Sequence, residues 1–219
     1  MGCDGTDDEL RAAYLNAIGD ARIAEPDEIS RDLEPIVYYN AALTWEGEPG
    51  KSRVLLLTWT SWDGYTDAAG DNMTLSREVW VAVPAELRDF YRQNESLADD
   101  SLVLRLEQLY GLPPHNGKQW FVEMWVLPAD LFRPSPDPDI NDCEAELEFP
   151  AWVDAVYRGW FNQLKSVSYG ASGYPWTRLG YTYDWGNEES EIGLSEFVIR
   201  AGSTVGVYSV AGNLDYFEN

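Results

Sequence analysis

Apolar residues recur at helical intervals in four segments of the chain. The clearest case follows Thr6, where a Thr-x-x-Glu capping pattern precedes Leu10, Tyr14 and Ile18. Gly111 gives the third segment a distinct end, because glycine is favoured just after a helix. The spacing predicts four helices, over residues 7–23, 85–93, 99–110 and 150–165. On the last helix we expect one stripe formed by Trp152, Val156, Trp160 and Leu164.

Alternating or aromatic-rich apolar runs between turn residues indicate strands. They predict strands over residues 53–62, 77–83, 119–127, 196–200 and 204–210, with the last two forming a hairpin. A second hairpin is expected where the Gly/Pro-rich turn at 47–50 precedes the first strand. Helices and strands do not alternate regularly, and no internal repeat is visible. The predicted fold is therefore a single α+β domain over residues 7–219, with an antiparallel sheet and several packed helices.

Composition narrows the function classes. The 219 residues are 45% hydrophobic, as in ordinary globular proteins, but 38 acidic residues face only 15 basic ones, which gives a net charge of −23. A nucleic-acid partner is not expected, because binding to phosphate depends on Lys and Arg. The single histidine, His115, excludes zinc sites built from several histidines, and we interpret it as a loop residue. No uncharged apolar run reaches the roughly 18 residues that a membrane-spanning helix requires.

The N-terminal Met1-Gly2-Cys3 sequence points to a lipid in two alternative ways. It resembles a bacterial lipoprotein start, with Gly2 before an acylated Cys3, and it also fits the myristoylation pattern. The acidic residues that follow would be repelled by the anionic cytoplasmic leaflet, which favours the lipoprotein. Residues 1–6 would then be a tether, and lipid would be the only contact with the membrane. The expected location is the bacterial cell envelope, facing the periplasm or the exterior; an accidental Gly-Cys pair is the remaining alternative.

The stretch from Pro134 to Asp154 contains seven acidic residues and no Lys or Arg. Four of its side chains have oxygen-ligand spacing like that of a calcium loop: Asp137, Asp139, Asn141 and Glu148. The position that needs a turn-forming glycine holds Asp142 instead. A calcium site and a solvated acidic loop are thus the two interpretations, and no other cofactor is expected.

The segment 174–185 combines aromatic rings with polar side chains and is punctuated by turn residues. We expect it to build a ligand-binding surface from Trp176, Arg178, Tyr181, Tyr183, Asp184 and Trp185. In such a site the rings supply apolar contact, and Arg178 and Asp184 orient a polar ligand. The structural alternative is that Arg178 and Asp184 form ion pairs, with each other or with neighbouring acids, that fasten the segment to the core.

Three segments carry a family resemblance. They are Gly111–Pro114 leading into Trp120–Val126, Asp130–Pro134, and Pro175–Trp185. Together they resemble a family of uncharacterised exported bacterial proteins, over roughly residues 50 to 210. The resemblance implies export, but it transfers no activity and no catalytic residue.

Two function classes follow from these observations. The first is a surface-anchored, non-catalytic module that binds a small molecule, a glycan or a protein. The second is an acid-based hydrolase that acts on carbohydrate, for which acids beside tryptophan, such as Asp63 and Asp184, have the required side chains. No Gly-x-Ser-x-Gly motif accompanies His115, so nucleophilic serine catalysis is not favoured.

The lipoprotein interpretation predicts that Cys3 is acylated. Mass spectrometry of the protein from its native host is expected to show a lipid-modified Cys3 in the membrane fraction. An unmodified N-terminus on soluble protein would contradict this prediction.

Overall fold

The structure, a computed structural model, describes residues 4–170 and 172–218. Its α-helices are α1 (Asp4–Asp20), α2 (Pro84–Asn94), α3 (Asp99–Leu109) and α4 (Ala155–Ser168). Its strands are β1 (Val54–Thr60), β2 (Asn72–Thr74), β3 (Val79–Ala82), β4 (Trp120–Val126), β5 (Leu131–Phe132), β6 (Tyr181–Tyr183), β7 (Ile192–Ile199) and β8 (Thr204–Gly212). Cys3 lies outside the described residues, so its lipidation stays a prediction.

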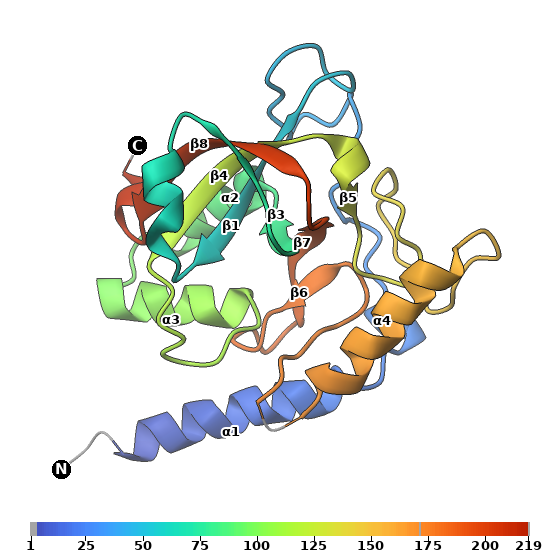
Figure 1. The fold of residues 1–219 in the computed structure, drawn as a ribbon. Coiled ribbons are helices and arrows are strands. Elements are labelled where there is room, and N and C mark those ends of the chain that lie inside the picture. The colour runs from blue at the N-terminus through green and yellow to red at the C-terminus, as the bar shows by residue number, and fades with distance from the viewer. Residues whose placement is uncertain (1–3, 171, 219) are drawn as a thin grey trace.

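The strands form one antiparallel sheet in the order β2-β8-β4-β1-β3-β7-β5, and β6 pairs with β7 beside this path (Figure 1). Its longest register joins β1 to β4, from the pair Val54–Val126 to the pair Thr60–Trp120. The last two expected strands are present as β7, which begins earlier at Ile192, and β8, but the expected hairpin between them is wrong. β7 pairs with β3, β5 and β6, whereas β8 pairs with β2 and β4, so the turn after β7 carries the chain to a different part of the sheet. The predicted single α+β fold with an antiparallel sheet is confirmed.

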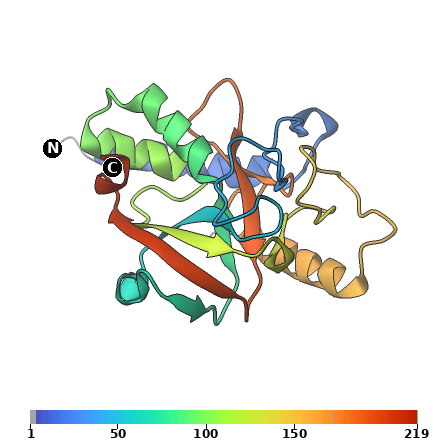
Figure 2. The ribbon, with the colours of Figure 1, turned by 90° about the horizontal axis from the view of Figure 1, so that it is seen from above.

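The two faces of the sheet are covered differently. Successive side chains along a strand point to opposite faces, so each strand contributes to both. One face packs into the largest apolar cluster, which includes Leu56, Met124 and Phe197 and is closed by loop residues such as Ile36 and Ile140. The other face carries two separate clusters. Helices α2 and α3 cover the first of them, and α4 covers the second, at the other end of the molecule (Figure 2).

The bounds of α4 correct the expected stripe. The helix begins at Ala155 because the Asp154 carboxylate accepts hydrogen bonds from the backbone N–H groups of Val156 and Tyr157. Trp152 therefore precedes the helix, and Val156 is 83% exposed. Tyr157 and Phe161 are the buried side chains, while Trp160 and Leu164 are partly buried against the same cluster.

Short elements account for most of the other differences. β2, β5 and β6 contain two or three residues each, too few for an alternating pattern to show in the sequence. The second expected hairpin is reduced to a single bridge between Trp45 and Val54. Helix α1 begins and ends three residues earlier than expected. Among residues 4–170 and 172–218, no helix has the length and apolarity that crossing a membrane requires.

Candidate ligand-binding cavity

A cavity of about 370 Å³ lies on the sheet face that the helices cover. It lies between the apolar cluster under α2 and α3 and the apolar cluster under α4. In Figure 1, β6 lies between α3 and α4, and the cavity is built from the ends of these three elements and from the sheet beside them. Its lining is Trp80, Tyr110, Gly111, Leu112, Lys118, Leu164, Ser168, Tyr174, Pro175, Trp176, Tyr181, Thr182, Tyr183 and Glu196. A smaller space of about 80 Å³ shares Glu196, Lys118 and Tyr110 with it and reaches β1.

The position of Glu196 follows from the alternation along β7. Leu194, Glu196 and Val198 share one face of the strand. Leu194 belongs to the cluster under α3, and Val198 belongs to the cluster under α4. Glu196 therefore points into the gap between the clusters. Its register partner on β3 is Ala82, whose small side chain leaves room above the carboxyl group.

The Glu196 carboxyl group is shielded from bulk water, and burial raises its pKa to about 8. Within the described part of the chain, no residue donates a hydrogen bond to this carboxyl group or forms an ion pair with it, and burial is the only cause of its pKa shift. With this pKa, the carboxyl group is mostly protonated at neutral pH.

Glu86 shows how a buried structural carboxylate differs from Glu196. Burial raises the pKa of Glu86 to about 7, but the group accepts hydrogen bonds from the backbone N–H and the hydroxyl of Ser195, which oppose the shift. The Ser195 hydroxyl oxygen also accepts a 2.8 Å hydrogen bond from the backbone N–H of Glu34. Glu86 therefore belongs to a connected network on the opposite face of β7, whereas Glu196 is left without a partner.

Lys118 brings a second titratable group to the cavity, from the loop before β4. Its ammonium group donates a 2.7 Å hydrogen bond to the carbonyl of Trp59. Burial lowers the pKa of this amine, and no ion pair opposes that effect. Two of the three ammonium hydrogens have no partner among the described residues.

Two further polar groups of the lining are buried without a hydrogen-bond partner. They are the Tyr110 hydroxyl and the Trp176 indole N–H, and the Trp176 side chain is only 6% exposed. Nearly all buried polar groups in folded proteins find a partner, either in the protein or in a bound molecule. The residues that line the cavity therefore combine aromatic rings with polar groups that have no hydrogen-bond partner in the described part of the protein.

Three of the six binding residues expected from the sequence line this cavity. Trp176, Tyr181 and Tyr183 do so, together with the neighbouring Tyr174, whose side chain is 54% exposed and marks the opening. We refer to residues 174–185 as the β6 segment. Gly111, just after α3, lets the backbone of the β6 segment lie close to this helix. The residue has φ +62°, and a Cβ atom there would lie only 3.1 Å from the Tyr183 carbonyl oxygen.

Asp184 and Trp185 point away from the cavity. Arg105 on α3 donates two 2.7 Å hydrogen bonds to the Asp184 carboxylate, whose side chain is 3% exposed. The Trp185 indole donates to the carbonyl of Leu112. Both residues instead line an acidic depression of about 490 Å³ beside α1, together with exposed Glu188. That depression is larger than the cavity, but its lining lacks unpartnered buried groups and is mostly polar.

Arg178 is also engaged in structural contacts. It is buried, has a left-handed backbone with φ +63°, and donates to the carbonyls of Ala21 and Arg22 just after α1. Its guanidinium group lies 5.6 Å from the centre of the Tyr169 ring. Arg178 and Asp184 therefore fasten the β6 segment to the chain after α1 and to α3, which is the role that the structural alternative gave them. The partners differ from that expectation, because Asp184 pairs with Arg105 and Arg178 binds backbone carbonyls instead of an acid.

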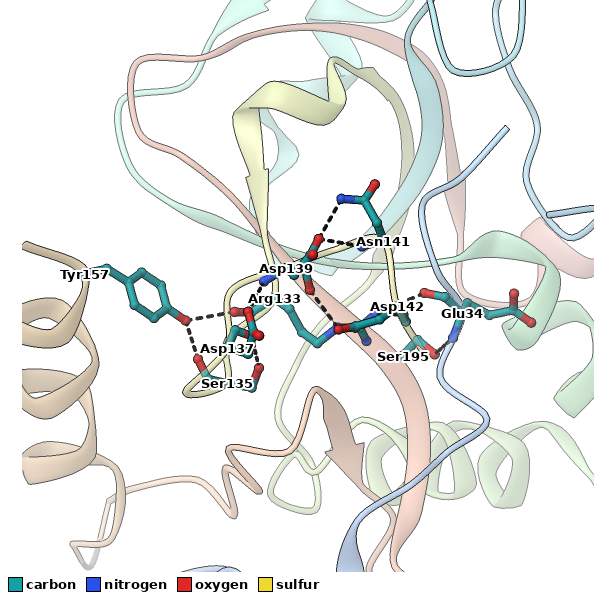
Figure 3. Close-up of polar contacts among 9 residues, drawn as sticks. All are labelled: Glu34, Arg133, Ser135, Asp137, Asp139, Asn141, Asp142, Tyr157 and Ser195. Carbon is teal, nitrogen blue, oxygen red and sulfur yellow. Dashed lines mark hydrogen bonds and ion pairs between the residues drawn. The ribbon is translucent and has the colours of Figure 1, made fainter. Parts of the chain in front are cut away.

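The acidic loop is organised by a cation that precedes it in the sequence. Figure 3 shows the fully buried Arg133 side chain among the loop residues. Its guanidinium group donates to the carbonyls of Asp139 and Asp142 and lies 3.9 Å from the Asp142 carboxylate. The Tyr157 hydroxyl donates a 2.8 Å hydrogen bond to the Arg133 carbonyl oxygen. Arg133 thus supplies the positive charge that the loop itself lacks.

The four expected calcium ligands occupy different environments. The Asp137 carboxylate accepts from the Asp139 backbone, and the Asp139 carboxylate accepts from the backbone and side chain of Asn141 (Figure 3). Glu148 is exposed. The carboxylates that do approach one another are those of Asp137, Asp142 and Glu146, with oxygens within 4.8 Å, and burial raises the pKa of each. Calcium binding stays a prediction. The three acids Asp137, Asp142 and Glu146 are the ones in this loop whose carboxylate oxygens lie close enough together to share one ion.

Sequence reasoning missed the residues that give the cavity its chemistry. Glu196 precedes the apolar run Phe197–Ile199 in a strand, and a charged residue beside such a run is a weak sign of burial. Lys118 and Tyr110 carry no pattern of their own. Their common location depends on the sheet order, which places the loop before β4 and the strand β7 beside the end of α3.

The Arg105–Asp184 pair predicts a stability effect. Asp184→Asn leaves the Arg105 guanidinium group half-paired in a mostly buried site, and we expect the free energy of unfolding to fall by about 3 kcal/mol. Asp89→Asn is the control, because the Arg92–Asp89 pair is exposed and should contribute less than about 0.5 kcal/mol. Urea unfolding of both variants measures the difference. Equal stabilities of Asp184→Asn and the unchanged protein would contradict the structural role.

Glu196 predicts a stability effect that depends on pH. Its pKa rises from the ordinary 4.5 to about 8 on folding, so between these values the unfolded chain loses a proton that the folded protein keeps. The residue therefore destabilises the fold increasingly as pH rises, until the effect levels off above about pH 8. Glu196→Gln removes this effect. We expect the variant to be more stable than the unchanged protein by about 2–4 kcal/mol at pH 8 and by less than about 1 kcal/mol at pH 5.

Urea unfolding at pH 5 and pH 8 tests this expectation. Glu188→Gln, at an exposed position, is the matched control and should change stability little at either pH. A difference between Glu196→Gln and the unchanged protein that is the same at both pH values would show that the carboxyl group is not held protonated.

The chain was compared with protein families, curated proteins and solved structures, and none of them matches it. The resemblance of its three segments to exported bacterial proteins therefore stays a prediction. The chemistry of the cavity is deduced from the cavity's own residues: an aromatic lining, an unpartnered carboxyl group and a buried amine.

Proposed function

We propose that the protein is a non-catalytic binding module that takes up a small, largely apolar molecule in the cavity between α3, α4 and β6. The observation that carries this proposal is the set of unpartnered polar groups in an aromatic lining: Glu196, Tyr110 and Trp176. Sites for small molecules usually combine apolar walls with a few polar groups that orient the ligand. Attachment to the cell envelope is part of the same proposal and rests on the Gly2-Cys3 sequence alone.

The lining favours binding over acid-based hydrolysis. Glycoside hydrolysis uses two carboxyl groups on either side of the scissile bond. Glu196 is the one carboxyl group among the described residues that line the cavity. Asp184, which the sequence offered for hydrolysis, is held by Arg105 outside the cavity, and Asp63 lies on an exposed turn.

Indole is a suitable probe for the cavity, because it is small, apolar and carries one N–H donor. We expect it to bind with millimolar or tighter affinity and to shift the indole N–H resonances of Trp80 and Trp176 in NMR titrations. Leu164→Trp places a larger side chain in the cavity and should weaken indole binding by about tenfold or more. Val167→Trp, on the exposed side of the same helix, is the matched control and should leave the affinity unchanged within about twofold.

Two outcomes would contradict the proposal. One is the absence of any resonance shift up to the solubility limit of indole. The other is equal weakening by Leu164→Trp and Val167→Trp, which would place indole outside the cavity.

A further inference from the structure

Two groups that can carry opposite charges line the same cavity without pairing with each other. The Glu196 carboxyl group enters from β7, and the Lys118 amine enters from the loop before β4. Among the described residues, neither a hydrogen bond nor an ion pair joins the two groups, and burial alone shifts the pKa of each. Each group can therefore meet a ligand group of its own.

The two groups come from different parts of the sheet. In the strand order, β1 and β3 lie between β4, which follows Lys118, and β7, which carries Glu196. The Lys118 ammonium group is held by the Trp59 carbonyl, and the Lys118 carbonyl accepts a 3.0 Å hydrogen bond from the Asn213 side-chain amide. Glu196 is fixed by its register with Ala82. Each group is thus held by contacts of its own, and none of these contacts joins it to the other.

We propose that the ligand of this cavity is a small zwitterion, whose ammonium group pairs with Glu196 and whose anionic group pairs with Lys118. An amino acid with an aromatic or aliphatic side chain is the simplest member of this class. The aromatic rings of Trp80 and Trp176, with centres 6.2 Å apart, line the space for its apolar part. This inference rests on the proposed binding function and assigns the chemistry of the ligand.

Charge balance supports the inference. Burial moves both groups toward their neutral forms, because in the described part of the chain neither group has an opposite charge beside it. A zwitterion supplies an opposite charge to each group at once and brings no net charge into the cavity. The other titratable groups of the lining are the phenols of Tyr110, Tyr174, Tyr181 and Tyr183. Burial raises the pKa of Tyr110, Tyr181 and Tyr183, which keeps these three phenols neutral.

Four probes that share one ring system separate the contributions. They are tryptophan, which is a zwitterion, tryptamine, which has only the ammonium group, indole-3-propionate, which has only the carboxylate, and neutral indole. Isothermal titration calorimetry at pH 7 is expected to show tryptophan binding at least about tenfold more tightly than indole. The affinities of the two singly charged probes should lie between those of tryptophan and indole.

Two variants assign the charges. Glu196→Gln should weaken the binding of tryptophan and of tryptamine by about tenfold or more. It should leave the affinity for indole-3-propionate unchanged within about twofold. Lys118→Met should weaken the binding of tryptophan and of indole-3-propionate by a similar factor. It should leave the affinity for tryptamine unchanged within about twofold. Thermal unfolding confirms that each variant is folded, and the affinity of neutral indole for the same variant is the reference against which the loss for each charged probe is measured.

The outcomes distinguish this inference from the function on which it rests. If indole binds in the cavity and tryptophan binds no better, or if the two variants affect all four probes equally, the zwitterion assignment is wrong and the binding function stands. If none of the four probes binds, the proposed function itself is overturned. Tight binding of tryptamine alone would instead assign a cationic ligand and contradict the role of Lys118.

Discussion

The ion pair between Arg105 and Asp184 determines where the β6 segment lies, and the cavity depends on that position. Two parallel 2.7 Å hydrogen bonds join the planar guanidinium group to the carboxylate, so the pair fixes orientation as well as distance. Arg105 lies on α3, whose C-terminal end supplies Tyr110 and Gly111 to the cavity lining. One helix therefore both holds the segment and forms part of the space beneath it. The cavity is consequently shaped by the protein's own contacts before any ligand enters.

Buried carboxyl groups elsewhere in the protein show why Glu196 stands apart. Glu123 on β4 pairs with Arg88 and accepts hydrogen bonds from the hydroxyls of Ser209 and Tyr216. Glu107 on α3 accepts hydrogen bonds from the backbone N–H groups of His115 and Asn116 and so orders the loop after the helix. Each of these groups stabilises the fold through its partners. Glu196 has no such partner in the described part of the chain, and its burial opposes ionisation at neutral pH.

The sequence predicted the parts of the fold that depend on long periodic patterns. The four α-helices and the long strands β1, β4 and β8 were identifiable because apolar spacing extends over seven or more residues in each. The β6 segment drew attention for its aromatic residues, four of which line the cavity, and ligand binding there stays a prediction. The roles of Arg178 and Asp184 were not predictable in the same way. Their partners lie 156 or 157 and 79 residues away in the sequence, and only the folded chain brings them together.

Several hydrogen bonds join helix α1 and the residues that follow it to the β6 segment. The hydroxyl of Tyr183, which lines the cavity, donates to the Asp20 carboxylate in the last turn of α1, and Arg178 binds the carbonyls that follow. The Tyr14 hydroxyl donates to the Gly173 carbonyl, one residue before the segment. With 17 residues, α1 is a rod about 25 Å long whose C-terminal half is joined to the cavity wall. Tension applied near the first residues of the chain would therefore be transmitted along the rod to that wall, which couples mechanical load at one end of the molecule to the shape of the cavity.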